Sequence, residues 1–436
     1  MTRTVAVIGG GLAGLTAAFG LSSQGYDVTI VEEASGLGGR LSSAPAIPLF
    51  GCYTATWALL DKLNTASLLR TSKHTPLEFL QPNGARTQYN PLPLPSPLNT
   101  LIGTTLFQGL SMRDRWHLLT FLERTWERDP PMPDDLETRA AEPWLGSIGQ
   151  SETARRSVWN PLSRFLLGDD LANASASLFM RTLRRHFFTG ARASKIIVPS
   201  VDVAGLLVTA LMERLSIQRV SIRLDTTVTG FRFAHDRMTA AEVEGREVLT
   251  ADYYVAALPF SRLRRVLPER VITHYAYFQQ LGRLQASSML AAHLQVPRWS
   301  KHASVILLPS GRFHWMTTRP RQAGETHATE VYMVAAGETS LFSSPDTTVL
   351  ESARTDLAAA CPLLDAPTWI SHRITRLSET ILSVKPGTQS YRPLQKSPFT
   401  NLFLAGDWTD TGWPATLESA IVSGDRCAAA IPASAQ

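Results

Sequence analysis

The first forty residues alternate between short apolar runs and glycine-rich turns. Residues 5–8 form an apolar, β-branched run, as in a buried parallel strand. Residues 12–23 form a longer Ala/Leu-rich stretch that fits a helix, and Gly25 is placed to end it. A second β-type run covers residues 28–31. This pattern predicts a strand, a helix and a second strand.

Residues 4–26 carry no charge, so a membrane span or a signal peptide is the alternative interpretation of this region. However, glycines interrupt the stretch at positions 9, 10, 11, 14 and 20. The stretch also divides into a β-type run, a turn and a helix, which favours the soluble interpretation.

The pattern becomes helical between about residues 60 and 195. Residues 111–129 predict a helix with Ser111 as its N-cap and Pro130-Pro131 as its stop. One face of that helix is apolar, formed by Met112, Trp116, Leu119, Leu122 and Trp126. The face fits a core stripe, and the alternatives are the wall of an apolar tunnel or a membrane-contacting face. Two further helices are expected on either side of Gly168-Asp169.

Strand and helix patterns then return. Residues 195–271 predict strands and a helix at 206–215, and residues 272–375 predict an antiparallel sheet with one solvent-facing side. Near the C-terminus, residues 402–405 predict a last buried strand, which we expect to lie beside the strand that opens the chain. A helix follows from about Ala415.

The fold class predicted is α/β, with a Rossmann-like part interleaved with an α+β part. The Rossmann-like part is expected to comprise residues 1–60, 195–271 and 386–436. The α+β part is expected to comprise residues 61–194, mostly helical, and 272–385, mostly antiparallel sheet.

Composition narrows the class of protein. The chain has 436 residues, 44% hydrophobic and 18% charged, with a net charge of +5. This is a soluble globular composition without a long Lys/Arg run, so nucleic-acid binding is not expected, whereas mild attraction to anionic lipid is. The three cysteines are far apart and form no CxxC, which argues against a disulfide framework or a metal site.

The turn after the first strand contains the spacing G-x-G-x-x-G at Gly9, Gly11 and Gly14. The first glycine permits a tight turn, the second lets a pyrophosphate approach, and the third lets the helix pack against the strand. The helix directs its first N–H groups, from Leu12 and Ala13 onward, at the phosphates. The motif therefore predicts a dinucleotide site.

An acidic pair and a second glycine loop follow the second strand. Glu32 stands at its tip, where a carboxylate accepts hydrogen bonds from ribose hydroxyls and disfavours NADP, and Glu33 is its neighbour. Gly38 and Gly39 allow a second close backbone approach to phosphate, and Arg40 supplies charge. The alternative for Arg40 is a solvated loop arginine.

The motifs together resemble one family. They are the glycine motif, Glu32, "GGR" at 38–40, "NPL" at 160–162, "VPSVDVAGLL" at 198–207, "AALP" at 256–259, Arg392-Pro393 and "NLFLAGDWTDTGWPATLESAIVSG" at 401–424. The chain resembles the squalene-associated FAD-dependent desaturase or hydroxysqualene dehydroxylase family, within the flavin amine oxidase and phytoene desaturase superfamily. The resemblance implies a fold in which the Rossmann-like part is an FAD-binding domain of the GR2 type and the α+β part is a substrate domain. It also implies FAD as cofactor and the reductive dehydroxylation of hydroxysqualene to squalene in hopanoid biosynthesis.

The resemblance also implies roles for single residues. Glu32 should bind the adenosine ribose, Arg40 should lie near the pyrophosphate, and Val228 should meet the adenine through its backbone. Gly406 should permit close approach and Asp407 should bind the middle of FAD. The backbone at Thr416 and Leu417 should face the flavin ring.

Aromatic side chains at Tyr53, Trp315 and Trp413 are the candidates for lining the substrate pocket, where they can stabilise positive charge. Asp410 is the candidate catalytic acid, and a loop cap after Asp407 is its alternative role. His186 is a weaker candidate acid, more simply interpreted as a histidine with satisfied hydrogen bonds or an exposed one.

Three other functions stay open: a carotenoid or phytoene desaturase, a flavin amine oxidase, and a non-catalytic degenerate flavoprotein. The last is favoured by the short stretch between Arg40 and Gly51-Cys52-Tyr53, where family members carry a longer segment. The expected partners are a long-chain isoprenoid substrate, an electron donor of unidentified nature and the membrane surface. The expected location is the cytoplasm, with peripheral contact at the inner membrane.

Overall fold

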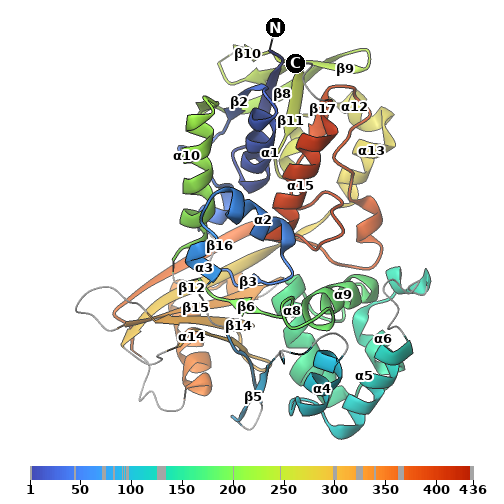
Figure 1. Cartoon of the computed structure of the whole chain (residues 1–436), viewed down its shortest axis with the longest axis vertical. Coiled ribbons are helices and arrows are strands. Elements are labelled where there is room, and N and C mark those ends of the chain that lie inside the picture. The colour runs from blue at the N-terminus through green and yellow to red at the C-terminus, as the bar shows by residue number, and fades with distance from the viewer. Residues whose placement is uncertain are drawn as a thin grey trace.

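The structure is a computed structural model of the whole chain (Figure 1). It describes residues 2–43, 46–70, 75–81, 84–90, 92, 94, 98–124, 134–199, 201–245, 247–297, 302–320, 328–337, 340–361 and 368–432.

A five-stranded parallel sheet forms the centre of the nucleotide-binding part, in the order β17-β11-β1-β2-β7. Its strands are β1 (Thr4–Ile8), β2 (Asp27–Val31), β7 (Ser221–Arg223), β11 (Tyr253–Ala256) and β17 (Leu402–Leu404). The strands come from three distant stretches of the chain. β1, β11 and β17 are almost wholly buried, as their continuous apolar runs predict, whereas the edge strand β7 is partly exposed. The α/β class with a Rossmann-like parallel sheet is confirmed.

One expected neighbour relationship is wrong. β17 pairs with β11, with Tyr254 opposite Leu402, and β11 pairs in turn with β1, with Val7 opposite Val255. The closing strand is therefore one position removed from the opening strand. All three runs are equally apolar, so hydrophobicity alone could not order them.

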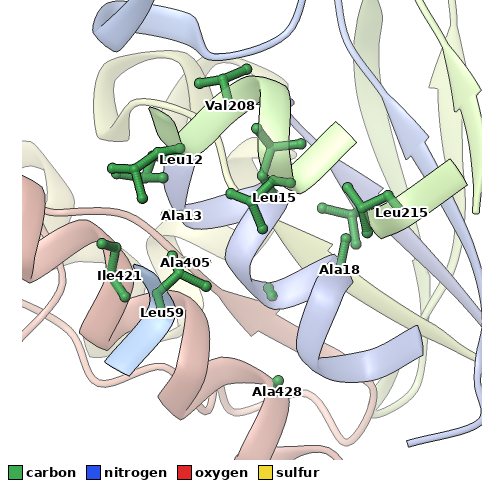
Figure 2. Close-up of a cluster of buried hydrophobic side chains, with 14 of the residues drawn as sticks. Leu12, Ala13, Leu15, Ala18, Leu59, Val208, Leu215, Ala405, Ile421 and Ala428 are labelled. Atoms are coloured by element: carbon green, nitrogen blue, oxygen red, sulfur yellow. The ribbon is translucent and has the colours of Figure 1, made fainter. Parts of the chain in front are cut away.

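Four helical segments pack around one hydrophobic cluster beside this sheet (Figure 2). They are α1 (Leu12–Ser23), α2 (Thr54–Lys62), α10 (Ala210–Ile217), which the π-helical turn Gly205–Thr209 precedes, and α15 (Leu417–Ala430). α1 and α15 approach closely because glycines face the partner helix. A Cβ atom on Gly424 would lie 2.6 Å from the carbonyl oxygen of Ala13, and one on Gly20 would lie 2.9 Å from Cβ of Ala428.

A seven-stranded sheet forms the second part, in the order β16-β12-β15-β14-β13-β4-β5. Its strands are β4 (Leu77–Leu80), β5 (Arg86–Tyr89), β12 (Ala286–Pro297), β13 (Ser304–Leu307), β14 (Trp315–Pro320), β15 (Ala328–Ala336) and β16 (Ser371–Leu382). Its pairs are antiparallel except β13 with β4. β4 and β5 come from the stretch expected to be mostly helical, so the sheet joins both substrate segments.

Helices gather beside this sheet, at the lower right of Figure 1. They are α4 (Leu98–Leu106), α5 (Met112–Arg124), α6 (Ala141–Ser147), α8 (Asn160–Leu167) and α9 (Ala176–Leu183). Ser111 caps α5 as predicted, because its hydroxyl accepts a hydrogen bond from the Asp114 N–H at 3.1 Å. Gly168 ends α8 in a left-handed conformation, with φ of 75°.

The apolar stripe expected on α5 is not a single core stripe. Leu122 is buried and Leu119 is partly buried, but Met112 and Trp116 are exposed. The core interpretation is therefore wrong for Met112 and Trp116. Trp126 and Pro130-Pro131 lie outside the described residues.

The remaining elements complete the two parts of the fold. A three-stranded sheet consists of β8 (Val228–Ala234), β9 (Arg237–Val243) and β10 (Glu247–Leu249), and a two-stranded one of β3 (Leu49–Phe50) and β6 (Ile196–Ile197). The other helices are α3 (Ser67–Arg70), α7 (Glu152–Ala154), α11 (Phe260–Val266), α12 (Glu269–His274), α13 (Ala276–Gln279) and α14 (Asp346–Ala360).

Candidate cofactor and substrate site

A cleft with an empty volume of about 2050 Å³ runs between the two parts of the fold. It is bordered by the predicted residues Gly9, Gly11, Leu12, Ala13, Glu32, Glu33, Gly38, Gly39, Arg40, Tyr53, Val228, Trp315, Gly406, Asp407, Thr416 and Leu417. Of the predicted set, Gly14, Asp410 and Trp413 do not border it. Residues scattered over four hundred positions are thus brought to one surface.

The first glycine loop has the geometry of a phosphate cradle. Gly9 has φ of 110°, and a Cβ there would lie 2.5 Å from the carbonyl oxygen of Ala257. A Cβ on Gly14 would lie 2.1 Å from the carbonyl oxygen of Gly9, so the third glycine allows the helix to pack against the turn. No atom lies within 4 Å of the Cβ position of Gly11, which faces open space.

The N-terminus of α1 completes this cradle. Gly11 is its N-cap, no side chain caps it, and its first turn carries no acid. The first N–H groups of α1 are therefore available to an anion. The second glycine loop packs against the first, because the Gly38 N–H donates to the carbonyl oxygen of Gly10 at 2.8 Å. Both loops form one continuous backbone surface.

Glu32 joins the two glycine loops to the end of β2. Its carboxylate accepts hydrogen bonds from the N–H groups of Gly10, at 2.6 Å, and Ala34, at 2.9 Å. A carboxylate has about four lone-pair positions, so it retains capacity for ribose hydroxyls. Its neighbour Glu33 forms an ion pair with Arg262 at 3.1 Å. Glu32 thus supports the loops besides bordering the cleft.

Arg40 and Asp407 form an ion pair across the cleft, with 2.6 Å between Nη2 and Oδ1. Arg40 also donates to the carbonyl oxygen of Thr380 at 2.6 Å. These two bonds connect the second glycine loop to β16 and to the loop after β17. Arg40 is therefore not a free solvated arginine.

The N-terminus of α15 borders the other end of the cleft. Thr416 is its N-cap and accepts a hydrogen bond from the Ser419 N–H at 3.3 Å. The helix begins at Leu417, two residues later than the sequence pattern predicts. Its positive end suits an acceptor that gains negative charge.

Glu418 is a residue that the sequence reasoning missed. It is buried, and its carboxylate accepts from the N–H groups of Ala55 and Thr56, both at 2.9 Å, and from the Thr56 hydroxyl at 2.7 Å. Burial raises its pKa. Glu418 thereby ties α15 to the start of α2, where Tyr53 is the N-cap. An acid is common in the first turn of a helix, so its position in the sequence does not reveal the contact between Glu418 and the start of α2.

Arg392 is the second missed residue. Its buried guanidinium donates to the carbonyl oxygens of Asp407 at 2.8 Å, Trp408 at 3.3 Å and Thr409 at 2.6 Å, and to that of Trp413. Burial lowers its pKa to about 10, so it is charged at neutral pH. One side chain thus shapes the whole loop that presents Asp407. The sequence marked Arg392-Pro393 as a motif but gave it no role.

The far end of the cleft is apolar and aromatic. Tyr53, Phe165 and Trp315 border it, and the rings of Phe165 and Trp315 lie 5.6 Å apart. Met289 and Leu377, cross-strand neighbours on β12 and β16, border it from the seven-stranded sheet.

Trp413 supports this wall from behind. Its ring contacts that of Tyr53 edge to face, with centroids 5.7 Å apart, and the guanidinium of Arg185 lies 4.6 Å from its centroid. Trp413 therefore contacts a cleft-lining residue without being one. It acts on the predicted pocket through Tyr53.

His186 lies in the same aromatic group and is fully buried. Its Nδ1 is 2.8 Å from the carbonyl oxygen of Thr182, to which it donates, and its Nε2 has no hydrogen-bond partner among the described residues. Its ring lies 4.5 Å from that of Phe50. Burial lowers its pKa to about 4, so it is neutral near pH 7 and cannot serve there as a ready proton donor.

Asp410 points into its own loop. One of its carboxylate oxygens accepts the Gly412 N–H at 3.1 Å, which is the loop-cap arrangement. Its role as the catalytic acid stays a prediction, and this position away from the cleft gives it no support.

These features define a dinucleotide-binding flavoprotein. The paired glycine loops, the uncapped N-terminus of α1 and Glu32 fit an adenosine diphosphate group, while Arg40, Asp407 and the start of α15 border the same cleft. The model of flavin containing amine oxidoreductases matches residues 12–432. The chain belongs to this family and is an FAD-dependent oxidoreductase.

Several curated proteins are similar along the whole chain. The 15-cis-phytoene desaturase of Synechococcus elongatus is 24% identical, and the alignment covers 98% of this chain and 95% of that protein. The zeta-carotene desaturase of Arabidopsis thaliana is 22% identical, with 98% and 85% covered. These relatives correspond to the carotenoid desaturase alternative rather than to a hydroxysqualene dehydroxylase.

Solved structures share the fold. An oxidoreductase from Methanosarcina mazei has a TM-score of 0.73 at 17% identity, with 97% of this chain and 98% of that chain covered. Putrescine oxidase bound to putrescine has a TM-score of 0.71 at 15% identity, with 98% of each chain covered. At these identities the likeness establishes the fold alone.

The described residues contain neither a metal-binding cluster nor a helix that could span a membrane. No group of three or more His, Cys, Asp or Glu side chains within the described ranges is arranged to hold a metal ion. Likewise, no helix in the part of the chain that the structure describes is both long and apolar enough to cross a bilayer.

Proposed function

We propose that the protein is an FAD-dependent desaturase of an elongated isoprenoid hydrocarbon. The observation that carries this proposal is the separation of charge from apolar surface along the cleft. Its charged border residues are Glu32, Glu33, Arg40, Arg262 and Asp407. Arg40 belongs to the second glycine loop and Glu32 and Glu33 follow β2, while Asp407 and Arg262 are paired with Arg40 and Glu33. The other end is bordered by aromatic and aliphatic side chains.

Pairing of the charges disfavours an amine substrate. Glu33 is paired with Arg262, and Asp407 with Arg40. Glu32 accepts two backbone hydrogen bonds. Among the described residues that border the cleft, no acid stands at the apolar end to recognise an ammonium group. A hydrocarbon chain needs no such partner, because its binding free energy comes from burial of apolar surface.

The residues of this chain have three tasks in such a reaction. The glycine loops, Glu32 and Arg40 hold the adenosine and pyrophosphate, and the start of α15 faces the reactive ring. Tyr53 and Trp315 exclude water and position the chain. When bound, FAD supplies the hydride chemistry. Desaturation would remove a hydride and a proton from adjacent carbons, and both would pass overall to oxidised FAD, so that the substrate gains a double bond as the flavin is reduced by two electrons.

Reductive dehydroxylation of hydroxysqualene is the second candidate. The observation that favours it is the stretch "AGDWTDTGWPAT" at 405–416, whose likeness to the squalene-associated branch is more specific than the glycine motifs. The same cleft suits its thirty-carbon substrate. This reaction runs in the opposite direction: a hydride is added at the carbon that loses hydroxide, which leaves as water after protonation, and an electron donor must reduce FAD first.

The direction of electron flow separates the candidates. Oxidised, FAD-loaded protein is mixed without oxygen with 15-cis-phytoene in detergent, and photoreduced protein with hydroxysqualene. Loss of oxidised-flavin absorbance with a product two hydrogens poorer supports the desaturase. Reoxidation with squalene formation supports the dehydroxylase instead. A third sample of oxidised protein is mixed with putrescine. Reduction of the flavin by putrescine, but not by phytoene, identifies an amine oxidase. A flavin that responds to none of the three substrates identifies a non-catalytic flavoprotein.

A further inference from the structure

Helices α4 and α5 form a hairpin with an unusual outer surface. Its exposed large apolar side chains are Leu98 (47%), Ile102 (39%), Leu106 (62%), Met112 (71%) and Trp116 (69%). The first three follow each other at intervals of four on α4, and the last two do so on α5, so each set lies on one helical face. We call these five side chains the hairpin patch. An apolar surface of this kind marks a contact site.

The hairpin patch is not the side of the hairpin that packs on the protein. Phe107, Leu110, Leu118 and Leu122 of the same hairpin are buried and belong to the core of the helical part. Arg115 fixes the two helices to each other, because it donates to the carbonyl oxygens of Leu110 at 2.9 Å and Thr105 at 2.6 Å. The hairpin is therefore apolar both on the side that packs on the protein and on the side that faces outward, and Arg115 holds its two helices together.

The charged residues of the hairpin have a small positive excess: Arg113, Arg115 and Arg124 against Asp114 and Glu123. Asp114 is buried, with its carboxylate bonded to the Ser151 N–H at 2.7 Å and to the hydroxyls of Ser111 and Ser151. Arg113 is exposed beside Met112, and Arg115 is partly exposed. Apolar side chains flanked by arginine and tryptophan match the interface of an anionic bilayer.

An apolar cavity lies directly behind the hairpin. It has an empty volume of about 430 Å³ and is bordered on one side by Thr104, Phe107, Leu110 and Leu118. Aromatic contacts continue from it toward the main cleft: Phe107 to Tyr89 at 6.0 Å, Tyr89 to Phe187 at 5.3 Å, Phe187 to His186 at 6.1 Å and His186 to Phe50 at 4.5 Å. Phe50 borders the cleft itself. The hairpin thus joins the outer surface to a continuous apolar interior.

We propose that the hairpin patch docks the protein on an anionic lipid bilayer. The choice of a bilayer rests on the proposed function, since an elongated isoprenoid is stored in membranes and not in water. A second copy of the chain fits less well, because a symmetric contact through this patch would bring two positive surfaces together. In Figure 1 the hairpin lies at the end of the molecule farthest from both termini, where a flat surface can approach it.

Vesicle binding by the FAD-loaded full chain tests this inference. We expect the protein to sediment with phosphatidylcholine vesicles that contain phosphatidylglycerol. The variant Leu106→Ser/Met112→Ser/Trp116→Ser should bind about 100-fold more weakly, because each side chain removed contributes a factor of about five. Arg113→Glu should weaken binding about 10-fold, and only to vesicles that contain phosphatidylglycerol.

The matched control replaces exposed apolar residues elsewhere, in Met212→Ser/Ile217→Ser/Ile370→Ser. This variant should bind vesicles as the natural protein does, and circular dichroism and flavin absorbance should be unchanged in all variants. The inference would be overturned if the hairpin variant bound vesicles as tightly as the natural protein. It would also be overturned if the natural protein bound neither to vesicles with phosphatidylglycerol nor to vesicles without it. A dimer that the hairpin variant alone disrupts, without a difference in vesicle binding, would assign the patch to a second copy.

This test is independent of the reaction. Turnover of substrate dissolved in detergent does not require docking, so it should be the same in the hairpin variant and in the control. Vesicle binding without any turnover would contradict the proposed function and leave the docking surface standing. Turnover without vesicle binding would contradict the docking surface alone.

Discussion

The side chains of Arg40 and Asp407 lie 2.6 Å apart, although 367 positions separate them in the chain. Arg40 follows the second glycine loop and Asp407 follows the last strand of the parallel sheet. Their ion pair joins the two ends of the sequence at the cleft. Two residues that are expected to bind one cofactor thus also hold together the segments that supply them.

Replacing Arg40 should weaken FAD binding. Arg40→Met removes the charge near the pyrophosphate and leaves Asp407 without its cation, so we expect the dissociation constant for FAD to rise about 10-fold to 100-fold, the cost of a charged hydrogen bond. Fluorescence titration of the FAD-free protein measures it. Arg232→Met is the control, because Arg232 forms a similar surface pair with Glu242 at 2.6 Å. Equal affinities for the two variants would refute this role of Arg40.

Loss of Arg392 should destabilise the whole loop that presents Asp407. Arg392→Met leaves four buried or partly buried carbonyl oxygens without their shared donor, so we expect the free energy of unfolding to fall by about 3 kcal/mol or more. FAD affinity should fall with it, because Asp407 lies on that loop. Urea unfolding with and without FAD measures both effects. Arg392→Lys keeps the charge but not the five donors, and it should recover only part of the loss.

The close approach of α1 and α15 predicts a steric effect at Gly424. In Gly424→Ala the new methyl group would meet Ala13 and Thr16 at less than 3 Å, so the helices must separate. We expect a loss of about 1–3 kcal/mol in stability, the usual cost of overpacking, and weaker FAD binding since both helices start at the cleft. Gly103→Ala on α4 is the control: its Cβ meets nothing within 4 Å. It should leave stability unchanged or raise it slightly.

Burial of His186 predicts a pH dependence of stability. Its pKa is about 4 in the folded protein against 6.5 as the ordinary value, so between these values the unfolded chain binds more protons. Stability is therefore full above pH 6.5 and falls as the pH drops toward 4, by about 1.4 kcal/mol per pH unit from this residue.

His186→Phe should remove that contribution. Urea unfolding at pH 6.5 and pH 5 should show a smaller loss in His186→Phe than in the natural protein, by about 2 kcal/mol. His274→Gln, at an exposed histidine, is the control and should leave the loss unchanged. A loss that is the same in all three proteins would mean that His186 is already accessible to protons in the folded state.

Local patterns were sufficient for the parts of the fold that depend on neighbours in sequence. The helix at 12–23 begins and ends where its glycines predict, and Ser111 caps α5. The place of β17 beside β11, and the contribution of β4 and β5 to the large sheet, depend on contacts between distant segments. Equally apolar strands carry no information about such an order.

The candidate cofactor site shows the same difference between contacts that are local in sequence and contacts that join distant segments. Glycine spacing and Glu32 identified the adenosine end because the backbone geometry there is local. Glu418 and Arg392 could not be found in this way, since Glu418 meets its partners 362 or 363 positions away and Arg392 acts through main-chain carbonyls. Asp410 is a candidate acid because it lies close to Asp407 in sequence. Its carboxylate, however, accepts a hydrogen bond from the Gly412 N–H within its own loop.

The most direct test of the proposed function is the response of the oxidised, FAD-loaded protein to 15-cis-phytoene in the absence of oxygen. We predict that the absorbance of oxidised flavin disappears and that one molecule of a more unsaturated product forms per flavin. A flavin that stays oxidised with phytoene but is reduced by putrescine would contradict the account, because it would place an amine in a cleft whose apolar end offers no acid to bind it.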